Sequence, residues 1–210
     1  MIEYREAKRD EIAYISKLAA LSFGHYPFFD FAFQSAFESE NEYFTYIEKL
    51  HRGHTRANMK QHKCFVGVKN GRIVSAALLQ DPSKRRISVP DYIMSGGVSL
   101  LFPVGFSRIL DFFDVSEEGH LDCAGQHPNA WYIELLTVDM GMKGCGLGSG
   151  MINDCLIPYI RENGGGELTL TTNTEKNCTF YKKNGFDCFA ERSLTRCGQT
   201  IQNWSFVKTV

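Results

Sequence analysis

The chain has 210 residues, of which 43% are hydrophobic and 22% are charged, as in an ordinary globular protein. A formal net charge of −1, without a basic stripe, argues against nucleic acid as a partner. No apolar run approaches the roughly 20 residues of a membrane span, and the N-terminal segment lacks the apolar region of a signal peptide. We therefore expect residues 1–210 to form one domain in the cytoplasm, with neither nucleic acid nor a membrane as partner.

Alternating and helical hydrophobic patterns divide residues 1–80 into a strand, helices and a hairpin. An N-cap at Asp10 precedes a helix that should end near Gly24, before Pro27. Asn70-Gly71 should join two strands, because a type I′ turn needs positive φ at both positions. The predicted ranges are 2–8 for the first strand, 12–24 and 41–58 for two helices, and 62–69 and 72–79 for the hairpin.

An aromatic-rich segment, residues 25–37, lies between these two helices. One interpretation is a helix whose apolar stripe packs on the core. The other is that some of the rings line an apolar substrate pocket, because so many aromatics exceed what one stripe needs. Tyr26 and Phe29 are the candidates for substrate contacts.

An irregular insertion at 82–128 opens the second half of the chain and could act as a lid or face the substrate. Within it, 91–95 and 103–114 read as helical and 119–129 reads as a loop. The remaining elements should be strands at 131–138, 167–173, 186–194 and 202–208, helices up to about residue 163 and at 174–185, and a turn around Cys197. This order predicts an α/β fold with a mixed central sheet of about seven strands flanked by helices.

The seven cysteines form no C-x-x-C pair, and their odd number leaves at least one unpaired. Free thiols in a reducing cytoplasm explain this most simply. His51 and His54 stand three positions apart on a predicted helix, a spacing that could hold a metal ion. No acidic or thiol partner is evident nearby, so no metal is expected.

The strand at 131–138 runs into a glycine-dense turn and then into a helix. Glycines let backbone N–H groups approach a ligand closely, and a helix N-terminus favours negative charge, so the turn predicts a phosphate site. A Walker loop is excluded, because no Lys-Ser or Lys-Thr follows a glycine here. The glycine spacing and the position after the fourth strand exclude a dinucleotide fingerprint.

The turn resembles the coenzyme A loop of the GNAT acetyltransferase superfamily, whose signature is Gln or Arg, two variable residues, Gly, any residue, then Gly or Ala. Lys143, Gly146 and Gly148 stand in these places. Lys143 keeps the cation but not the planar fork of arginine. A second stretch, N-C-T-F-Y-K-K-N-G-F at 177–186, is similar to the family's pattern of an Asn, an aromatic-Tyr pair and Gly-Phe.

Both signatures lie within residues 131–190. Within the superfamily, the chain resembles most the puromycin N-acetyltransferase-like branch. The shared features are Tyr26-Pro27 after the first helix, the long insertion before the fourth strand, and the run at 170–181.

The resemblance implies a single-domain GNAT-like fold whose fourth and fifth strands splay apart, with acetyl-CoA as co-substrate. Backbone N–H groups of the loop would hold the pyrophosphate, and the exposed edge of the fourth strand would pair with the pantetheine arm. The implied cofactor-binding residues are Leu136, Thr137, Val138, Lys143, Gly144, Cys145, Gly146, Leu147, Gly148, Ser149 and Asn177.

Tyr181 matches the family's tyrosine beside the coenzyme sulfur and is the expected proton donor to the leaving thiolate. Glu134 is the expected base, because a carboxylate inside an apolar strand is costly unless it is paired or functional. Strand alternation would place it on the same face as Leu136 and Val138. His127, just before the strand, and water are the alternative bases. The competing interpretations are a core aromatic for Tyr181 and a structural ion pair for Glu134.

These residues predict an acetyl-CoA-dependent N-acetyltransferase that acts on the amine of a small molecule by direct attack in a ternary complex. Cys145 and Cys178 have no matched base in the sequence, so an acetyl-cysteine is not expected. The alternatives are a protein or peptide N-acetyltransferase and a non-catalytic acyl-CoA-binding module. The sequence does not decide whether the chain forms a homodimer.

Overall fold

The computed structural model describes residues 1–196 and 198–210. Seven strands form one mixed sheet in the order β1-β2-β3-β4-β5-β7-β6. The strands are β1 (Glu3–Glu6), β2 (Lys63–Lys69), β3 (Arg72–Gln80), β4 (Trp131–Val138), β5 (Glu167–Thr172), β6 (Asp187–Arg196) and β7 (Gln199–Thr209). The predicted α/β fold with seven strands is confirmed.

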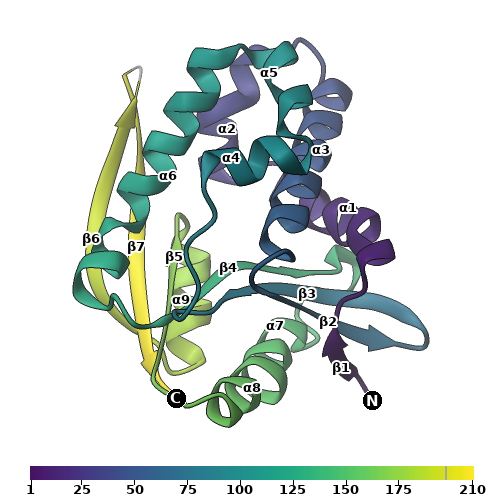
Figure 1. Ribbon diagram of the computed structural model, residues 1–210, viewed down its shortest axis with the longest axis vertical. Coiled ribbons are helices and arrows are strands. Elements are labelled where there is room, and N and C mark those ends of the chain that lie inside the picture. The colour runs from purple at the N-terminus through teal and green to yellow at the C-terminus, as the bar shows by residue number, and fades with distance from the viewer. Residues whose placement is uncertain (197) are drawn as a thin grey trace.

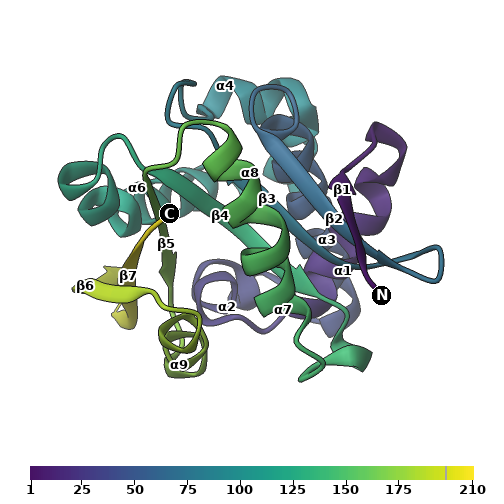
Figure 2. The same cartoon turned by 90° about the horizontal axis from the view of Figure 1, so that it is seen from below.

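Helices cover both faces of the sheet (Figures 1 and 2). On one face lie α1 (Ile12–Phe23), α2 (Pro27–Phe33), α3 (Glu40–Asn58), α4 (Val89–Tyr92), α5 (Val98–Val104) and α6 (Phe106–Gln126). The other face carries α7 (Leu147–Gly150) and α8 (Ile157–Glu162), which join through the π-helical turns of Met151–Leu156, and α9 (Glu175–Lys183) lies near the β6 end.

The predicted elements of residues 1–80 are confirmed to within a few residues, with one correction. Asp10 is not an N-cap, because residues Arg9–Glu11 form a short 3-10 helix before α1. The Glu11 carboxylate instead accepts the backbone N–H of Lys8 at 2.8 Å. Asn70 and Gly71 have φ of 52° and 73°, as the type I′ turn requires.

The insertion is more helical than its sequence indicates. The predicted loop at 119–129 is wrong, because α6 continues to Gln126. Packing explains the difference: a Cβ on Gly119 would lie only 3.4 Å from Leu194, so this glycine lets α6 approach the sheet closely. Asn203 also donates to the Gly119 carbonyl oxygen at 2.9 Å, which ties the helix to β7. Tertiary contacts therefore override the low helix propensity of the segment.

The fourth and fifth strands splay apart, as expected. The parallel pairing of β4 with β5 joins Trp131 to Leu168 and Tyr132 to Thr169, and within the described chain it extends no further. The β4 edge from Ile133 onward therefore faces an opening in the sheet. Its other edge stays paired with β3 up to Val138.

A β-bulge in β4 at Glu134 changes which face of the sheet the following side chains occupy. Ile133 pairs with Leu79 and Leu135 pairs with Leu78, so Glu134 is the extra residue. One extra residue reverses the alternation of side chains beyond it.

Core packing shows the reversal. Ile133 packs with the α7–α8 side of the sheet, Leu135 packs against α1, and Leu136 returns to the α7–α8 side. The expectation that Glu134 shares a face with Leu136 and Val138 is wrong, because Glu134 points toward α3.

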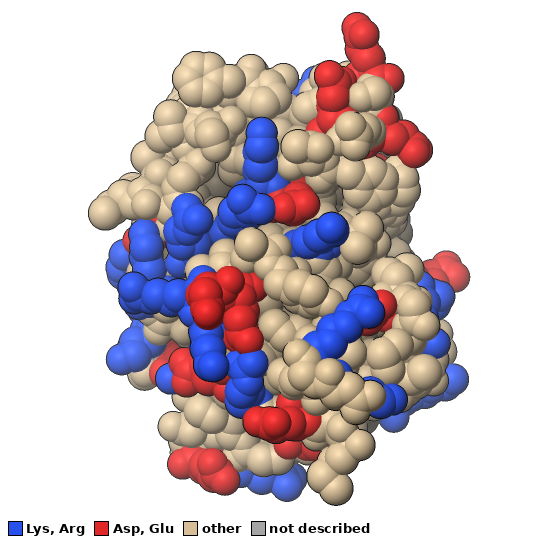
Figure 3. All heavy atoms as spheres, turned by 90° about the vertical axis from the view of Figure 1, so that its right-hand side faces the viewer, with Lys and Arg blue, Asp and Glu red and all other residues tan. Residues whose placement is uncertain are grey.

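The surface carries charges of both signs. On the face shown in Figure 3, Lys and Arg side chains are interspersed with Asp and Glu, and a group of Asp and Glu side chains stands at the upper right. No helix in the described part of the chain is both long and apolar enough to cross a membrane. The β6–β7 hairpin is present, with Arg196 paired to Gln199, but Cys197 in its predicted turn lies outside the described residues.

Candidate active site

A cleft of about 1030 Å³ runs from the glycine loop, past the opening between β4 and β5, to the aromatic segment and the insertion. Most of the predicted site residues line it. They are Tyr26, Phe29, Glu134, Leu136, Val138, Lys143, Gly144, Gly146, Leu147, Gly148, Ser149, Asn177 and Tyr181. Thr137 and Cys145 are not among the lining residues.

The Asp139 side chain and two glycines with positive φ shape the glycine loop. Asp139 accepts the N–H of Gly141 at 2.9 Å, and its other carboxylate oxygen accepts from Arg72 at 2.8 Å. Gly144 and Gly146 then adopt φ of 84° and 75°, which a residue with a Cβ rarely does. A Cβ at either glycine would meet open space. Close approach of a ligand to this backbone is therefore unobstructed.

The helix that follows the loop begins at Leu147 and continues to Glu162. Its first turn leaves N–H groups without intrahelical acceptors, and its dipole favours an anion there. Gly148 is required for a separate reason: a Cβ would lie 2.9 Å from the ring of Phe180. The loop, α7 and α9 thus fit together only with glycine at this position.

Two lysines stand together at the loop. Lys176 of α9 lines the cleft beside Lys143, and the contact with its ammonium lowers the pKa of Lys143. Two like charges held close together favour an anion between or beside them. Cys145 is exposed at the outside of the loop.

The residues of β4 at the opening divide between the two faces of the sheet. Leu136 and Val138 line the cleft. The Thr137 hydroxyl is buried on the other side, where it donates to the Leu18 carbonyl oxygen at 3.4 Å. Only the backbone of Thr137 can therefore serve a ligand in the opening.

Tyr26 links the aromatic segment to the far side of the opening. Its hydroxyl oxygen accepts the backbone N–H of Asn173 at 2.6 Å and lies 2.9 Å from the hydroxyl of Thr172. Asn177 donates to the same Thr172 hydroxyl oxygen at 3.0 Å. This chain of contacts fixes the start of α2 against the end of β5 and the start of α9.

Tyr181 lies in the cleft wall among other rings. Its centroid is 5.7 Å from that of Phe186 and 5.9 Å from that of Phe206, so its position is set by packing. No hydrogen bond to its hydroxyl is found in the described ranges 1–196 and 198–210. Burial, reinforced by Tyr26, raises the pKa of Tyr181, which keeps the phenol protonated and able to donate.

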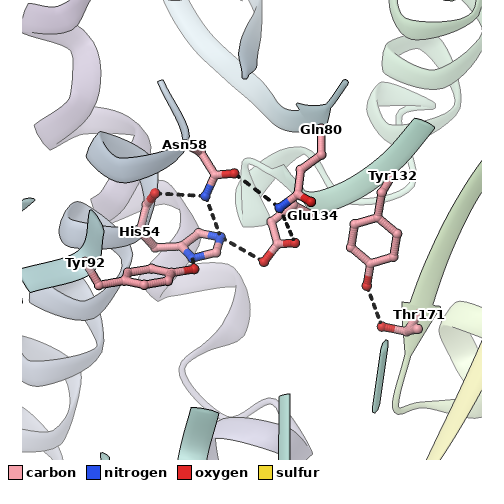
Figure 4. A network of polar contacts seen from close by, with 7 residues as sticks. All are labelled: His54, Asn58, Gln80, Tyr92, Tyr132, Glu134 and Thr171. Carbon is pink, nitrogen blue, oxygen red and sulfur yellow. Dashed lines mark hydrogen bonds and ion pairs between the residues drawn. The ribbon is translucent and has the colours of Figure 1, made fainter. Parts of the chain in front are cut away.

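Glu134 is the centre of a polar network in the cleft (Figure 4). One carboxylate oxygen lies 3.3 Å from Nε2 of His54, and the other accepts from Gln80 at 3.0 Å. Nδ1 of His54 lies 3.0 Å from the Tyr92 hydroxyl, and Asn58 donates to the His54 carbonyl oxygen at 3.0 Å. Residues from α3, β3, α4 and β4 thus converge on one carboxylate.

The network indicates which nitrogen of His54 carries the proton. A carboxylate can only accept, so Nε2 donates to Glu134 and Nδ1 accepts from the Tyr92 hydroxyl. Burial lowers the pKa of His54, against the opposing effect of Glu134, and burial raises the pKa of Tyr92. A neutral imidazole and a protonated phenol satisfy the contacts of His54 with Glu134 and Tyr92.

His54, Gln80 and Tyr92 were not predicted as site residues. The interpretation that His54 has no acidic partner is wrong, since Glu134 of β4 points toward it. The sequence does contain one signal, since His51, His54 and Asn58 recur at helical spacing on the inner side of a helix. Within the part of the chain that the structure describes, no group of three or more His, Cys, Asp or Glu is placed to hold a metal ion.

His127, the alternative base, lies apart from the residues that line the cleft. Its Nδ1 is 2.8 Å from the Glu167 carboxylate, and its ring packs edge-on against Phe189 at 4.5 Å. These contacts give it a role in joining α6 to the sheet.

The acetyltransferase (GNAT) family matches the chain by sequence over residues 33–186. No protein of curated function matches the chain in sequence. Similar solved structures include a polyamine N-acetyltransferase of Drosophila melanogaster that catalyses the formation of N-acetylagmatine, 17% identical over 100% of both chains with a TM-score of 0.63.

Two bacterial structures are also similar. A histone acetyltransferase HPA2 and related acetyltransferase of Corynebacterium glutamicum is 16% identical over 99% of this chain and 96% of its own, with a TM-score of 0.64. A putative acetyltransferase of Salmonella typhimurium, solved with acetyl-CoA, is 12% identical over 99% of this chain and 94% of its own, with a TM-score of 0.54. At these identities the structures establish the fold, and the sequence match over most of the chain establishes the family. The chain belongs to the GNAT acetyltransferase family.

Proposed function

We propose that the chain uses acetyl-CoA to acetylate the amine of a small molecule, with residues 1–210 acting as one domain. The observation that carries the proposal is that the glycine loop, the β4 edge, Tyr181 and Glu134 line one continuous cleft. Each supplies one requirement of acetyl transfer: a grip on phosphate, a guide for an extended arm, a proton donor and a base.

The loop and its surroundings fit acetyl-CoA. The unobstructed backbone at Gly144 and Gly146, the free N–H groups of the first turn of α7 and the two adjacent lysines suit a pyrophosphate. The β4 edge beyond Tyr132 would pair with the pantetheine arm as an added strand would. Asn177 would contact the arm from α9. When bound, acetyl-CoA supplies an activated acyl group and a thiolate leaving group.

Glu134 would accept the proton of the acceptor ammonium, because only the neutral amine can attack a carbonyl carbon. His54 and Gln80 each donate to one of its oxygens, and each oxygen keeps a further lone pair for the acceptor or for a bridging water. His54 and Gln80 are therefore positioning residues. The C–N bond forms as the C–S bond breaks, and the nitrogen, whose first proton went to Glu134, then loses its second proton to solvent. Tyr181 would give its proton to the leaving sulfur and regain one from solvent.

The peptide alternative is less well supported. A peptide acceptor needs an open groove, whereas residues of α2, α4 and α6 enclose the acceptor side of the cleft. Tyr26-Pro27 and the long insertion support a place in the puromycin N-acetyltransferase-like branch. The six cysteines that the structure describes are all free thiols, which supports a cytoplasmic location.

A thiol-release assay with the purified chain, acetyl-CoA and a panel of primary amines tests the proposed function. We expect release of one coenzyme A per N-acetylated amine, identified by mass spectrometry. Calorimetric binding of acetyl-CoA without release for any amine would instead indicate a non-catalytic acyl-CoA-binding module. Release only with peptides would indicate the peptide acetyltransferase.

A further inference from the structure

We propose that the acceptor is a primary monoamine carried on an apolar body, either aryl or alkyl, and not a polyamine. This inference rests on the proposed function and specifies its substrate class. Three observations support it: the rings of the acceptor side, its exposed apolar rim, and the scarcity of charge along its wall.

Aromatic rings from α2 and α6 form the wall of the acceptor side. Phe112 packs against Phe28 at 5.3 Å and stacks on Phe29 at 6.2 Å between ring centroids. Phe113 packs on Tyr92 at 5.1 Å, which carries this wall up to the Glu134 network. All of these side chains line the cleft and are only partly buried, so their free faces can cover an apolar substrate.

An apolar rim continues this wall to the surface. Val89, Ile93, Phe106 and Leu110 line the cleft and are 38%, 48%, 64% and 39% exposed. Large apolar side chains gathered at the mouth of a cleft mark a binding surface more often than chance exposure. An acceptor with an extended apolar body can therefore remain in apolar contact from the base to the opening.

The acceptor side offers few partners for a second positive charge. Glu134 lines it from β4 and is the carboxylate at which the amine must react. Glu117 is already paired with Arg86 at 3.1 Å, and Asp114 is exposed. Burial lowers the pKa of His51 and of His120 to about 3, so both are neutral.

A polyamine or agmatine would bring its distal cation against this wall. Moving that cation out of water without a partner is unfavourable. The Drosophila structure is that of an enzyme that forms N-acetylagmatine, so the two proteins should differ in acceptor although they share a fold.

Steady-state kinetics with the full chain tests the inference. The acceptors are butylamine, hexylamine, octylamine, 2-phenylethylamine, agmatine and spermidine. We expect kcat/KM to rise about threefold to fourfold for each buried methylene. The kcat/KM values for agmatine and for spermidine should be at least about tenfold below the value for hexylamine.

The outcomes separate this inference from the proposed function. If agmatine or spermidine equals or exceeds octylamine, or if chain length has no effect, the substrate class is wrong and the acetyltransferase stands. If acetyl-CoA binds but no amine is acetylated, the proposed function fails, and the substrate class with it.

A pair of variants in α6 tests the placement of the acceptor body. Leu110→Glu adds a carboxylate at the rim, whereas Leu121→Glu adds one at a position 53% exposed on the same helix that does not line the cleft. Leu110→Glu should raise the kcat/KM ratio of agmatine to octylamine severalfold, and Leu121→Glu should leave it unchanged. Equal ratios in the two variants would overturn the placement.

Discussion

The carboxylate of Glu134 lies 3.3 Å from Nε2 of His54, and this contact joins β4 to α3 beside the opening in the sheet. Glu134 lies on the same face as Tyr132, opposite Ile133, and the bulge then moves Leu136 to the other face. A single extra residue thus lets Glu134 and Leu136 line the cleft from opposite faces of β4. The β4 edge beyond Tyr132 is free for an extended ligand, because its pairing with β5 ends there.

Replacement of Gly144 or Gly146 by valine should abolish acetyl-CoA binding, measured by calorimetry. Both glycines have positive φ, and the new side chain would occupy the space that the phosphates need. Gly71→Val is the matched control, since Gly71 has a similar φ of 73° in a hairpin turn outside the cleft. Loss of binding in all three variants would mean that backbone strain, and not the phosphate site, is responsible.

Tyr181→Phe should lower kcat about 10²–10⁴-fold if the phenol protonates the leaving thiolate. The fold should be unaffected, because the ring packing is kept and no hydrogen bond to the hydroxyl occurs among the described residues. Thermal unfolding and acetyl-CoA affinity are the controls. Unchanged kcat would make Tyr181 a core aromatic without a chemical role.

Cys145→Ser and Cys178→Ser should each retain activity within about twofold, because direct attack needs no thiol. Burial raises the pKa of Cys178, which disfavours the nucleophilic thiolate. Mass spectrometry of the chain after incubation with acetyl-CoA alone should show no acetylated cysteine. Complete loss of activity in either variant, with intact acetyl-CoA binding, would establish a covalent route instead.

The stability of the chain should fall as the pH drops from about 6 to 4.5. His51 is buried, and its pKa is lowered from 6.5 to about 3, so in this range the unfolded chain binds a proton that the folded chain does not. Such a group lowers the free energy of unfolding by about 1.4 kcal/mol per pH unit. The free energy of unfolding, measured with urea at each pH, should change more steeply with pH for the wild type than for His51→Leu. The two slopes should differ by about this amount per pH unit. If the free energy of unfolding changed equally with pH in both proteins, His51 would not be neutral in the folded chain.

Much of the fold could be predicted because its signals are local. The Asn70-Gly71 turn, the strand at 131–138 and the three glycines after the α8 helix depend on neighbouring residues alone. The loop predicted at 119–129 failed because α6 is held there by distant partners, including Asn203 and the β6–β7 hairpin. Propensity does not register such contacts.

The candidate site was predicted in part for the same reason. Motif residues such as Gly146 and Tyr181 stand at fixed spacings, whereas His54 reaches Glu134 across 80 positions of sequence and through a bulge. Periodicity assumes regular alternation, so it assigned Glu134 to the wrong face. Tyr92 comes from the insertion, where no pattern indicated its direction.

The pH dependence of kcat/KM for Glu134→Gln against the wild type tests most directly whether Glu134 accepts the proton of the acceptor. With a carboxylate base, kcat/KM of the wild type should be level across the neutral range up to the pKa of the amine, about 10. Glu134→Gln keeps the shape of the side chain. Its kcat/KM at pH 7 should be about 10²–10⁴-fold below that of the wild type. Its kcat/KM should then rise about tenfold per pH unit up to the pKa of the amine, because only the neutral amine would react. If the wild type and Glu134→Gln had the same kcat/KM at every pH, Glu134 would not be the group that accepts the proton of the amine.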